Sequence, residues 1–365
     1  MDVMQNDKLM VIYGNKALQM AYDIMTAANV KGMLSRDMKI VLKPNLVVAK
    51  PSISGATTSP ELVEGVIRYL KDNGFNNITI MEGSWIGDST RNAFRVCGYQ
   101  QLSDKYGIPL VDLKSSRTKT CTYGGSSVDI CSSVLEADFI INMPVLKAHC
   151  QTSLTCALKN LKGCISDSEK RRFHSLGLHK PIALLNKLLK THLVLVDGIM
   201  GDLTFEEGGT PVEMNRVILG LDPVLVDAYA ASLLGYAVED IPYIGLSEKL
   251  GVGSTAINAS TVIEINKADA PQAKLTPSRK VAHLAAYVKE DRACSACYGS
   301  LIHALNRMDE NGTLRKLNQK VYIGQGYKGQ KLDATGIGIC TSGCTKSLRG
   351  CPPNARDIVE FLECK

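Results

Sequence analysis

The sequence contains no long apolar run and no localised excess of positive charge. No uninterrupted apolar stretch approaches the roughly 18 residues that a membrane-spanning helix needs. The opening segment, MDVMQNDKLM, lacks a basic stretch followed by an apolar one, so we expect no signal peptide. The net charge of +6 (42 basic against 36 acidic residues) is spread thinly, whereas nucleic-acid binding usually needs basic residues concentrated on one surface. These absences predict a cytoplasmic protein that binds neither a membrane nor a nucleic acid.

Nucleotide-binding motifs are also lacking. The sequence has no Walker A motif, and its G-x-G-x-x-G segment, Gly324–Gly329, is not followed by a helical pattern. A dinucleotide-binding turn needs that helix, because the helix N-terminus holds the pyrophosphate. Disorder and coiled coil are excluded as well, because 45% of the residues are hydrophobic and 21% are charged.

Short apolar runs suited to strands alternate with helical patterns along most of the chain. The run Met38–Lys43 is stopped by Pro44, and Ser59-Pro60-Glu61 combines an N-cap, a first-turn proline and an acidic residue, which predicts a helix start. A hairpin is expected around Gly124-Gly125. Further strands are expected at Asn77–Met81, Asp138–Asn142, His192–Val196, Arg216–Leu219 and Thr261–Ile265. This alternation predicts an α/β fold, a layered structure whose largely parallel or mixed sheet carries helices on both faces.

The chain divides into two expected domains. At roughly 150 residues per domain, its 365 residues leave room for about two. The polar segment Ala268–Arg279 carries two prolines and is typical of a boundary. We therefore expect an α/β domain over residues 1–267 and a cysteine-rich, iron–sulfur-binding region over residues 268–365.

Cysteine is abundant, with 12 residues in the chain. Without an export signal, so many cysteines indicate thiol chemistry or metal binding. Cys294 and Cys297 form a C-x-x-C pair, and Cys340, Cys344 and Cys351 follow downstream, the last before two prolines. Two close cysteines completed by distant ones, with proline after the last, are typical of four-iron, four-sulfur (4Fe–4S) sites. Five cysteines compete for four positions, and we favour Cys294, Cys297, Cys340 and Cys351, with Cys344 as the alternative.

Zinc is the alternative cofactor, because it also accepts four cysteines. Structural zinc sites usually pair two short knuckles, whereas the downstream half here reads C-x3-C-x6-C. A C-x-x-C pair alone would also fit a redox-active dithiol. Inert buried cysteines are common singly, but a cluster of five favours a metal centre.

Polar residues follow the expected strands, and in open α/β sheets ligands bind outside the carboxyl ends of the strands. These residues are Lys43, Asn45, Glu82, Lys147, His149 and Asp197, with Lys159 and Asn160 near an expected helix end. Lysines there suit a carboxylate or phosphate, and a histidine can move a proton near neutral pH. We expect catalytic roles for Lys43, Lys147, His149 and Asp197, and binding of a small anionic substrate by Asn45, Glu82, Lys159 and Asn160. The alternative is that they are solvated strand ends without function.

Several segments together resemble the family named domain of unknown function 362, in its iron–sulfur-bearing form. The matching segments are Lys43–Val47 (KPNLV), Thr57–Pro60, Pro144–Gly163, Arg171–His174 (RRFH), Asp197–Ile199, Leu221–Asp227 (LDPVLVD), Cys294–Cys297 and Gly350–Pro353 (GCPP). The resemblance implies an α/β domain with an associated four-iron cluster, often in anaerobic microbes. It implies that Cys294, Cys297, Cys340 and Cys351 occupy the cluster positions. It also implies that five polar residues belong to its characteristic segments: Lys43, Lys147, His149, Lys159 and Asn160. Cys344 departs from this pattern, and the resemblance implies no particular reaction.

Three functions follow from these observations. The leading hypothesis is a 4Fe–4S protein, an iron–sulfur oxidoreductase that exchanges electrons with a substrate or with a partner protein. The second is an isomerase or lyase that acts on an anionic metabolite and carries a structural cluster. The third is a non-enzymatic binding module stapled by zinc.

Overall fold

A computed structural model of the chain describes residues 3–204, 208–268 and 280–363. The chain divides into two compact units. The first, called here the α/β unit, comprises Met1–Glu169 and His179–Pro277; the second, called the cysteine unit, comprises Lys170–Leu178 and Ser278–Lys365. The expected boundary segment, Ala268–Arg279, lies outside the described residues except for Ala268. Within the described residues, none of the helices combines the length and apolar character needed to traverse a bilayer.

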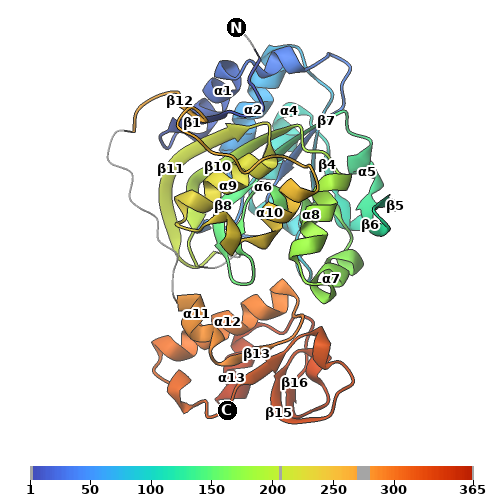
Figure 1. Ribbon diagram of the computed structural model, residues 1–365, viewed down its shortest axis with the longest axis vertical. Coiled ribbons are helices and arrows are strands. Elements are labelled where there is room, and N and C mark those ends of the chain that lie inside the picture. Colours follow the sequence, from blue (N-terminus) through green and yellow to red (C-terminus); the bar gives the residue numbers. More distant parts are fainter. Residues whose placement is uncertain (1–2, 205–207, 269–279, 364–365) are drawn as a thin grey trace. The chain divides into compact units, whose positions relative to one another are not determined.

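A ten-stranded mixed sheet forms the centre of the α/β unit (Figure 1). Its main order is β12-β1-β11-β10-β7-β2-β3-β4, and β8 pairs with both β10 and β9. The strands are β1 (Leu9–Tyr13), β2 (Ile40–Pro44), β3 (Ile78–Glu82), β4 (Leu110–Asp112), β7 (Phe139–Met143), β8 (Val145–His149), β9 (Ser153–Thr155), β10 (Leu193–Asp202), β11 (Pro211–Gly220) and β12 (Val262–Glu264). Strands β7, β2, β3 and β4 pair in parallel, whereas β11 runs antiparallel to both β1 and β10.

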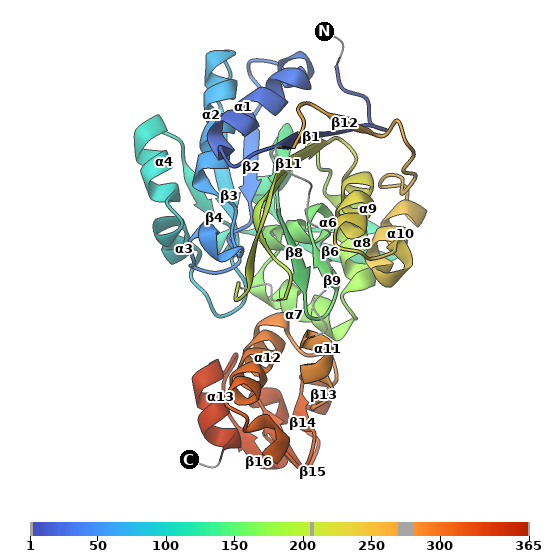
Figure 2. The same ribbon diagram turned by 90° about the vertical axis from the view of Figure 1, so that its left-hand side faces the viewer.

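Helices cover both faces of this sheet, as expected (Figure 2). The described helices of the unit are α1 (Ala17–Ala27), α2 (Pro60–Asp72), α3 (Thr90–Val96), α4 (Tyr99–Tyr106), α5 (Ser132–Leu135), α6 (Ala157–Asn160), α8 (His179–Leu188), α9 (Pro223–Leu233) and α10 (Pro242–Lys249), and α7 (Asp167–Ser175) spans the two units. Figure 2 shows α1 to α4 on one side of the sheet and α6, α8, α9 and α10 on the other.

The two faces follow from the alternation of side chains along each strand. Leu42 and Val217 belong to the buried cluster that packs under α1 and α2. Their neighbours Val41 and Ile218 are also buried, and the pleat turns them to the opposite face. A strand that is buried on both faces needs apolar side chains at successive positions. Its sequence is therefore a continuous apolar run, which is the pattern that predicted these strands.

Local signals in the sequence correctly predicted where several helices and strands begin or turn. Ser59 caps α2 through its hydroxyl, which accepts from the Leu62 N–H, and Pro60 is the first helical residue. The expected hairpin forms β5 (Thr118–Tyr123) and β6 (Ser126–Cys131), but these strands make a separate two-stranded sheet. The mixed character of the main sheet comes instead from β11 and β9.

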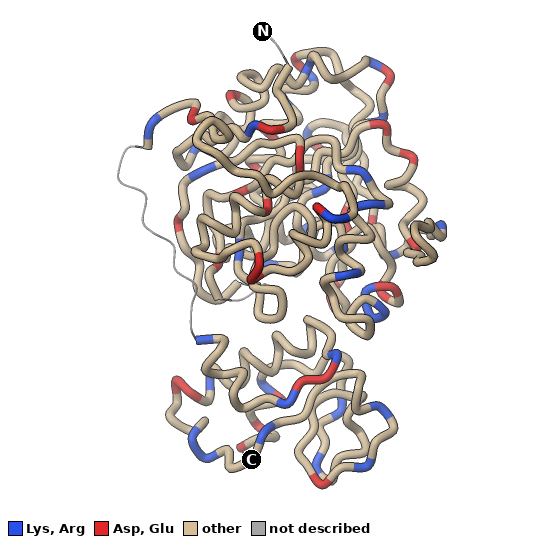
Figure 3. The backbone as a smooth tube through the Cα atoms, in the orientation of Figure 1, with Lys and Arg blue, Asp and Glu red and all other residues tan. Residues whose placement is uncertain are grey.

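The cysteine unit contains a second, wholly parallel sheet of order β13-β14-β15-β16. Its strands are β13 (Val288–Glu290), β14 (Val321–Ile323), β15 (Leu332–Ile337) and β16 (Cys344–Leu348), and its helices are α11 (Lys280–Ala285), α12 (Ser295–Glu310) and α13 (Ala355–Leu362). Acidic and basic residues alternate along the backbone of both units, as the thin spread of charge predicts (Figure 3).

Candidate functional sites

Four cysteines line one small cavity within the cysteine unit. Cys294, Cys297, Cys340 and Cys351 surround a volume of about 50 Å³, together with Arg171, Gln325 and three glycines. Cys294 is the N-cap of α12, Cys297 lies in its first turn, Cys340 lies in the short 3-10 turn η8 (Ile339–Thr341), and Cys351 follows β16. The favoured set of four cysteines is therefore gathered at one place.

The cavity lies at the carboxyl ends of the four parallel strands. Cys294 follows β13, Gly324 and Gln325 follow β14, Cys340 follows β15, and Cys351 follows β16. This is where parallel sheets of α/β proteins usually place their sites. Because the strands are parallel, their carboxyl ends lie at the same edge of the sheet. Cysteines that follow different strands therefore lie close together although they are distant in the sequence.

Glycine leaves the cavity room for a bulky group. Gly324, Gly338 and Gly350 all line it, and all three have positive φ angles, 124°, 93° and 153°. Such angles are unfavourable for residues with a Cβ, and a Cβ on Gly324 would collide with the Asp291 carbonyl. The backbone can therefore approach an inorganic core closely.

Burial and the neighbouring sulfurs both affect the ionisation of Cys297. Burial, and then the neighbouring Cys294, Cys351 and Cys340, raise the pKa of Cys297 to about 12. Arg171 acts in the opposite direction, because its positive charge favours the thiolate. The Cys297 thiol is therefore protonated near neutral pH, so metal binding to its sulfur would release a proton.

Cys344 lies apart from this group. It is buried on β16, its Sγ lies against Gly336, and it is not among the described residues that line the cavity. Within the described residues, no group of three or more His, Cys, Asp or Glu side chains is arranged to hold a single metal ion.

Two polar residues for which the sequence predicted no role at the cysteine site contact the cavity. The Gln325 side chain donates to Cys294 Sγ at 3.7 Å and to the Arg171 carbonyl at 3.0 Å. Arg171 lies in the segment Arg171–His174 that resembles the family, and it lines the cavity. Nothing in the spacing of the sequence connects residue 171 to residue 325; only the fold does.

The α/β unit holds a second polar centre, at the carboxyl ends of β2 and β3. Lys43 is fully buried and its Nζ lies 2.7 Å from Glu82 Oε2. The same ammonium donates to the Pro44 carbonyl at 2.8 Å and to Asn160 Oδ1 at 3.5 Å. Glu82 in turn accepts from the Leu46 and Gly83 N–H groups. Lys43 and Glu82 thus form a compensated buried ion pair.

The remaining residues expected in the crevice are also buried and hydrogen-bonded. Lys147 lies on β8, a strand where a strand-end loop was expected, and donates to the Ala56 carbonyl at 2.6 Å and to Asn45 at 3.3 Å. His149 Nδ1 accepts from the Gln151 and Thr152 N–H groups, so Nε2 carries the proton in the neutral ring. Lys159 donates to the Thr155 hydroxyl at 3.1 Å.

A buried carboxylate holds the helix that carries Lys159 and Asn160. Asp227 accepts from the Ala157 and Leu158 N–H groups at 2.7 and 3.2 Å, which satisfies the first turn of α6. Burial raises the pKa of Asp227 to about 7.

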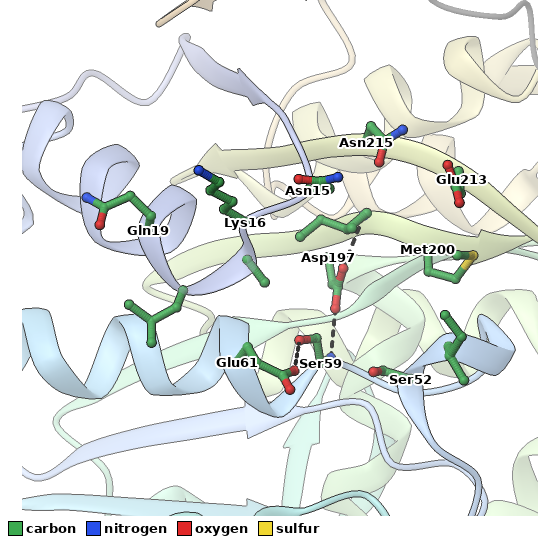
Figure 4. Close-up of a pocket in the computed structure, with 14 residues that line it drawn as sticks. Asn15, Lys16, Gln19, Ser52, Ser59, Glu61, Asp197, Met200, Glu213 and Asn215 are labelled. Carbon is green, nitrogen blue, oxygen red and sulfur yellow. Dashed lines mark hydrogen bonds between the residues drawn. The ribbon is translucent and has the colours of Figure 1, made fainter.

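Asp197 lies on the floor of an open groove of about 560 Å³, called here the Asp197 groove (Figure 4). Its carboxylate accepts from the Ser59 N–H at 2.7 Å and from the Ile199 N–H at 3.2 Å, and only 2% of the residue is exposed. Burial, and then the charge of Glu61, raises the pKa of Asp197 to about 6. A carboxyl group with such a pKa in a cleft is typical of a functional site.

The backbone that lines the groove is irregular. The register of β10 against β11 shifts between Gly198 and Met200, and the intervening Ile199 lines the groove. Asn215, also in the lining, has a φ of 48°, which is unusual for a residue other than glycine. Bulges and strained residues cluster at functional sites. Of the residues expected in the crevice, only Asp197 lines this groove.

The family model described as "domain of unknown function (DUF362)" matches residues 40–232, more than half of the chain. The chain belongs to the DUF362 family. The DUF362 segment contains the Lys43–Glu82 pair, Lys147, Asp197 and Asp227, and it ends before Cys294. The match thus covers most of the α/β unit and, of the cysteine unit, residues 170–178. The four cysteines lie outside it and are judged from their own geometry.

A thylakoid-associated protein of Synechocystis sp. is 27% identical over 229 residues, which cover 60% of this chain and 70% of that protein. Among solved structures, the lactate racemase apoprotein of Thermoanaerobacterium thermosaccharolyticum is similar with a TM-score of 0.35 and 12% identity. That similarity covers 60% of this chain and 56% of the racemase chain. So low a TM-score supports no inference about the function of this DUF362 protein.

Proposed function

We propose that this protein binds a 4Fe–4S cluster through Cys294, Cys297, Cys340 and Cys351 and carries electrons to or from a partner protein. The observation that supports the proposal is that four thiols from three chain segments line a single cavity at the carboxyl ends of parallel strands. Four thiolates are the complete ligand set of such a cluster, which would supply one-electron chemistry.

The four thiols and the residues around them fit a 4Fe–4S cluster better than a zinc ion. The described lining of the cavity offers four thiols and no histidine or carboxylate, and the C-x3-C-x6-C spacing of its downstream half differs from the paired knuckles of structural zinc sites. The glycines at 324, 338 and 350 keep side chains away from the core. Arg171 contributes positive charge, and Gln325 a hydrogen bond to a ligand sulfur, both of which stabilise thiolate.

The isomerase or lyase alternative is less well supported. It requires Lys43 and Lys147 to hold an anion, but the Lys43 ammonium contacts a buried carboxylate and the Lys147 ammonium contacts a carbonyl. Neither residue lines the Asp197 groove among the described residues.

Anaerobic purification tests the proposal. We expect about four iron and four sulfide ions per chain, a broad visible absorption that bleaches on reduction, and an electron paramagnetic resonance signal in the reduced protein. Cys294→Ser, Cys297→Ser, Cys340→Ser and Cys351→Ser should each lower the iron content.

Cys344→Ser is the matched control, because Cys344 lies in the same unit but outside the cavity lining. It should leave the iron content unchanged. A colourless anaerobic protein that carries zinc, or loss of iron in Cys344→Ser with retention in Cys340→Ser, would contradict the proposal.

A further inference from the structure

Most of the charged side chains that line the Asp197 groove are acidic. Neither the proposed cluster nor the expected anion site accounts for this negative charge. Among the described residues that line the groove, three carry carboxyl groups, Glu61, Asp197 and Glu213, and Lys16 alone carries an ammonium group. Three carboxylates and one ammonium favour a ligand that brings positive charge, because such a ligand gains from complementary electrostatics.

The charges lie in different parts of the groove (Figure 4). Lys16 extends from the start of α1 on one side, Glu213 extends from β11 on the other, and Asp197 lies between them with Glu61 nearby. Lys16 is the N-cap of α1, and no side chain in the described structure caps that helix by a hydrogen bond. The end of the groove at Lys16 therefore suits a carboxylate, and the rest of the groove suits ammonium groups.

Apolar side chains connect these charged parts. Ile53, Ile199 and Met200 line the groove, and Ile53 is 70% exposed although it is a large hydrophobic residue. An aliphatic ligand stem would cover these side chains. The cavity volume of about 560 Å³ lies within the range of small-molecule sites.

We propose that the Asp197 groove binds a small metabolite with the chemistry of a basic amino acid: one carboxylate and two ammonium groups joined by an aliphatic stem. The carboxylate would pair with Lys16, and the ammonium groups with Glu61, Asp197 and Glu213. The groove lies wholly within the α/β unit, so this inference does not depend on the cluster.

Isothermal titration calorimetry on the full-length protein at neutral pH tests the proposal, with L-lysine, cadaverine and glutarate as probes. Cadaverine lacks the carboxylate of lysine, and glutarate lacks both ammonium groups. We expect L-lysine to bind saturably, cadaverine to bind more weakly and glutarate not to bind.

Substitutions on exposed walls of the groove separate the two ends of the ligand. Glu61→Gln and Glu213→Gln should each weaken L-lysine binding by roughly fivefold or more. Lys16→Ala should weaken L-lysine binding but not cadaverine binding, because cadaverine has no carboxylate to pair with Lys16 and is relieved of a like charge. Glu239→Gln, an exposed residue of the same unit outside the groove, should leave both affinities unchanged.

Three results would each overturn the proposal: no saturable binding of L-lysine, preferential binding of glutarate, or L-lysine affinities that are the same in Glu61→Gln and Glu213→Gln as in the unchanged protein. None of them bears on the iron content, so failure here and failure of the cluster proposal are distinguishable.

Discussion

At the scale of single residues, the raised pKa of Asp197 makes the stability of the protein depend on pH. Its raised pKa of about 6 means that the folded protein binds this proton more tightly than the unfolded chain does. Its contribution to stability is therefore complete below the unfolded pKa of about 3.9 and is lost as the pH rises through the folded value near 6. The cause is burial, which disfavours the charged form.

We predict that Asp197→Asn removes this pH dependence. Relative to Asp197→Asn, the unchanged protein should lose on the order of 3 kcal/mol of stability between about pH 4 and pH 6. Denaturant titrations followed by circular dichroism at several pH values measure the difference. The amide also loses one backbone hydrogen bond, but that loss does not vary with pH. Parallel curves for the two proteins would show that Asp197 has an ordinary pKa.

Gln325 provides a second prediction at this scale. Its hydrogen bond to Cys294 Sγ stabilises negative charge on sulfur, and a reduced cluster carries more negative charge than an oxidised one. Gln325→Leu should therefore lower the reduction potential, by an amount on the order of tens of millivolts. Gln330→Leu is the matched control, because Gln330 donates to the Gly326 carbonyl and is not among the described lining residues. A potential that moves equally in both variants would argue against this role.

At the scale of elements, the 3-10 turn η4 (Leu161–Cys164) closes over the buried Lys43–Glu82 pair. Gly163 has no side chain there, and an added Cβ would collide with Glu82 Oε1 and lie 2.7 Å from Lys43 Nζ. Glycine at position 163 therefore leaves the space that the buried Lys43 and Glu82 side chains occupy.

Gly163→Ala should consequently destabilise the protein by about 1–3 kcal/mol, measured as a shift in the denaturation midpoint. Gly245→Ala is the matched control: Gly245 lies in α10, and an added Cβ there meets no atom within 4 Å. That change should stabilise the protein by about 0.4–1 kcal/mol. Equal effects of the two substitutions would mean that close packing at Gly163 is unimportant.

At the scale of the whole molecule, the cysteine unit is discontinuous in the sequence. It combines residues 170–178 with the chain from 278 onwards, and Ser295 contacts His174 across this separation. Arg171 reaches the cavity for the same reason. Iron binding should therefore stabilise both segments together, because a ligand stabilises only the structure to which it binds.

Hydrogen exchange followed by mass spectrometry tests this coupling. Removal of iron by an oxidant and a chelator should speed amide exchange in residues 280–363 and in residues 170–178 alike. Residues 9–169 should keep their exchange rates. Faster exchange throughout the α/β unit would mean that the two units unfold cooperatively.

Much of the architecture could be predicted from the sequence because its signals are local. The apolar run at β2, the Ser59–Pro60 start of α2 and the Gly124–Gly125 hairpin each depend on neighbouring residues alone. The C-x-x-C spacing likewise indicated that Cys294 and Cys297 lie close together, at the start of one helix. Strand β8 was missed because Lys147 and His149 interrupt the apolar pattern, although both side chains are buried by distant partners.

The sequence by itself determined the α/β class, the helix caps and the choice of cysteines as candidate ligands, since each depends on residue type and short spacing. Only the tertiary structure decided that Cys340 and Cys351, rather than Cys344, lie beside Cys294 and Cys297. It also decided that Lys43 pairs with Glu82 while Lys16 and Glu213 line the same groove. The reason is physical: charge pairing, burial and cavity shape depend on which distant segments the sheets bring together. A local sequence pattern does not specify which distant segments become neighbours.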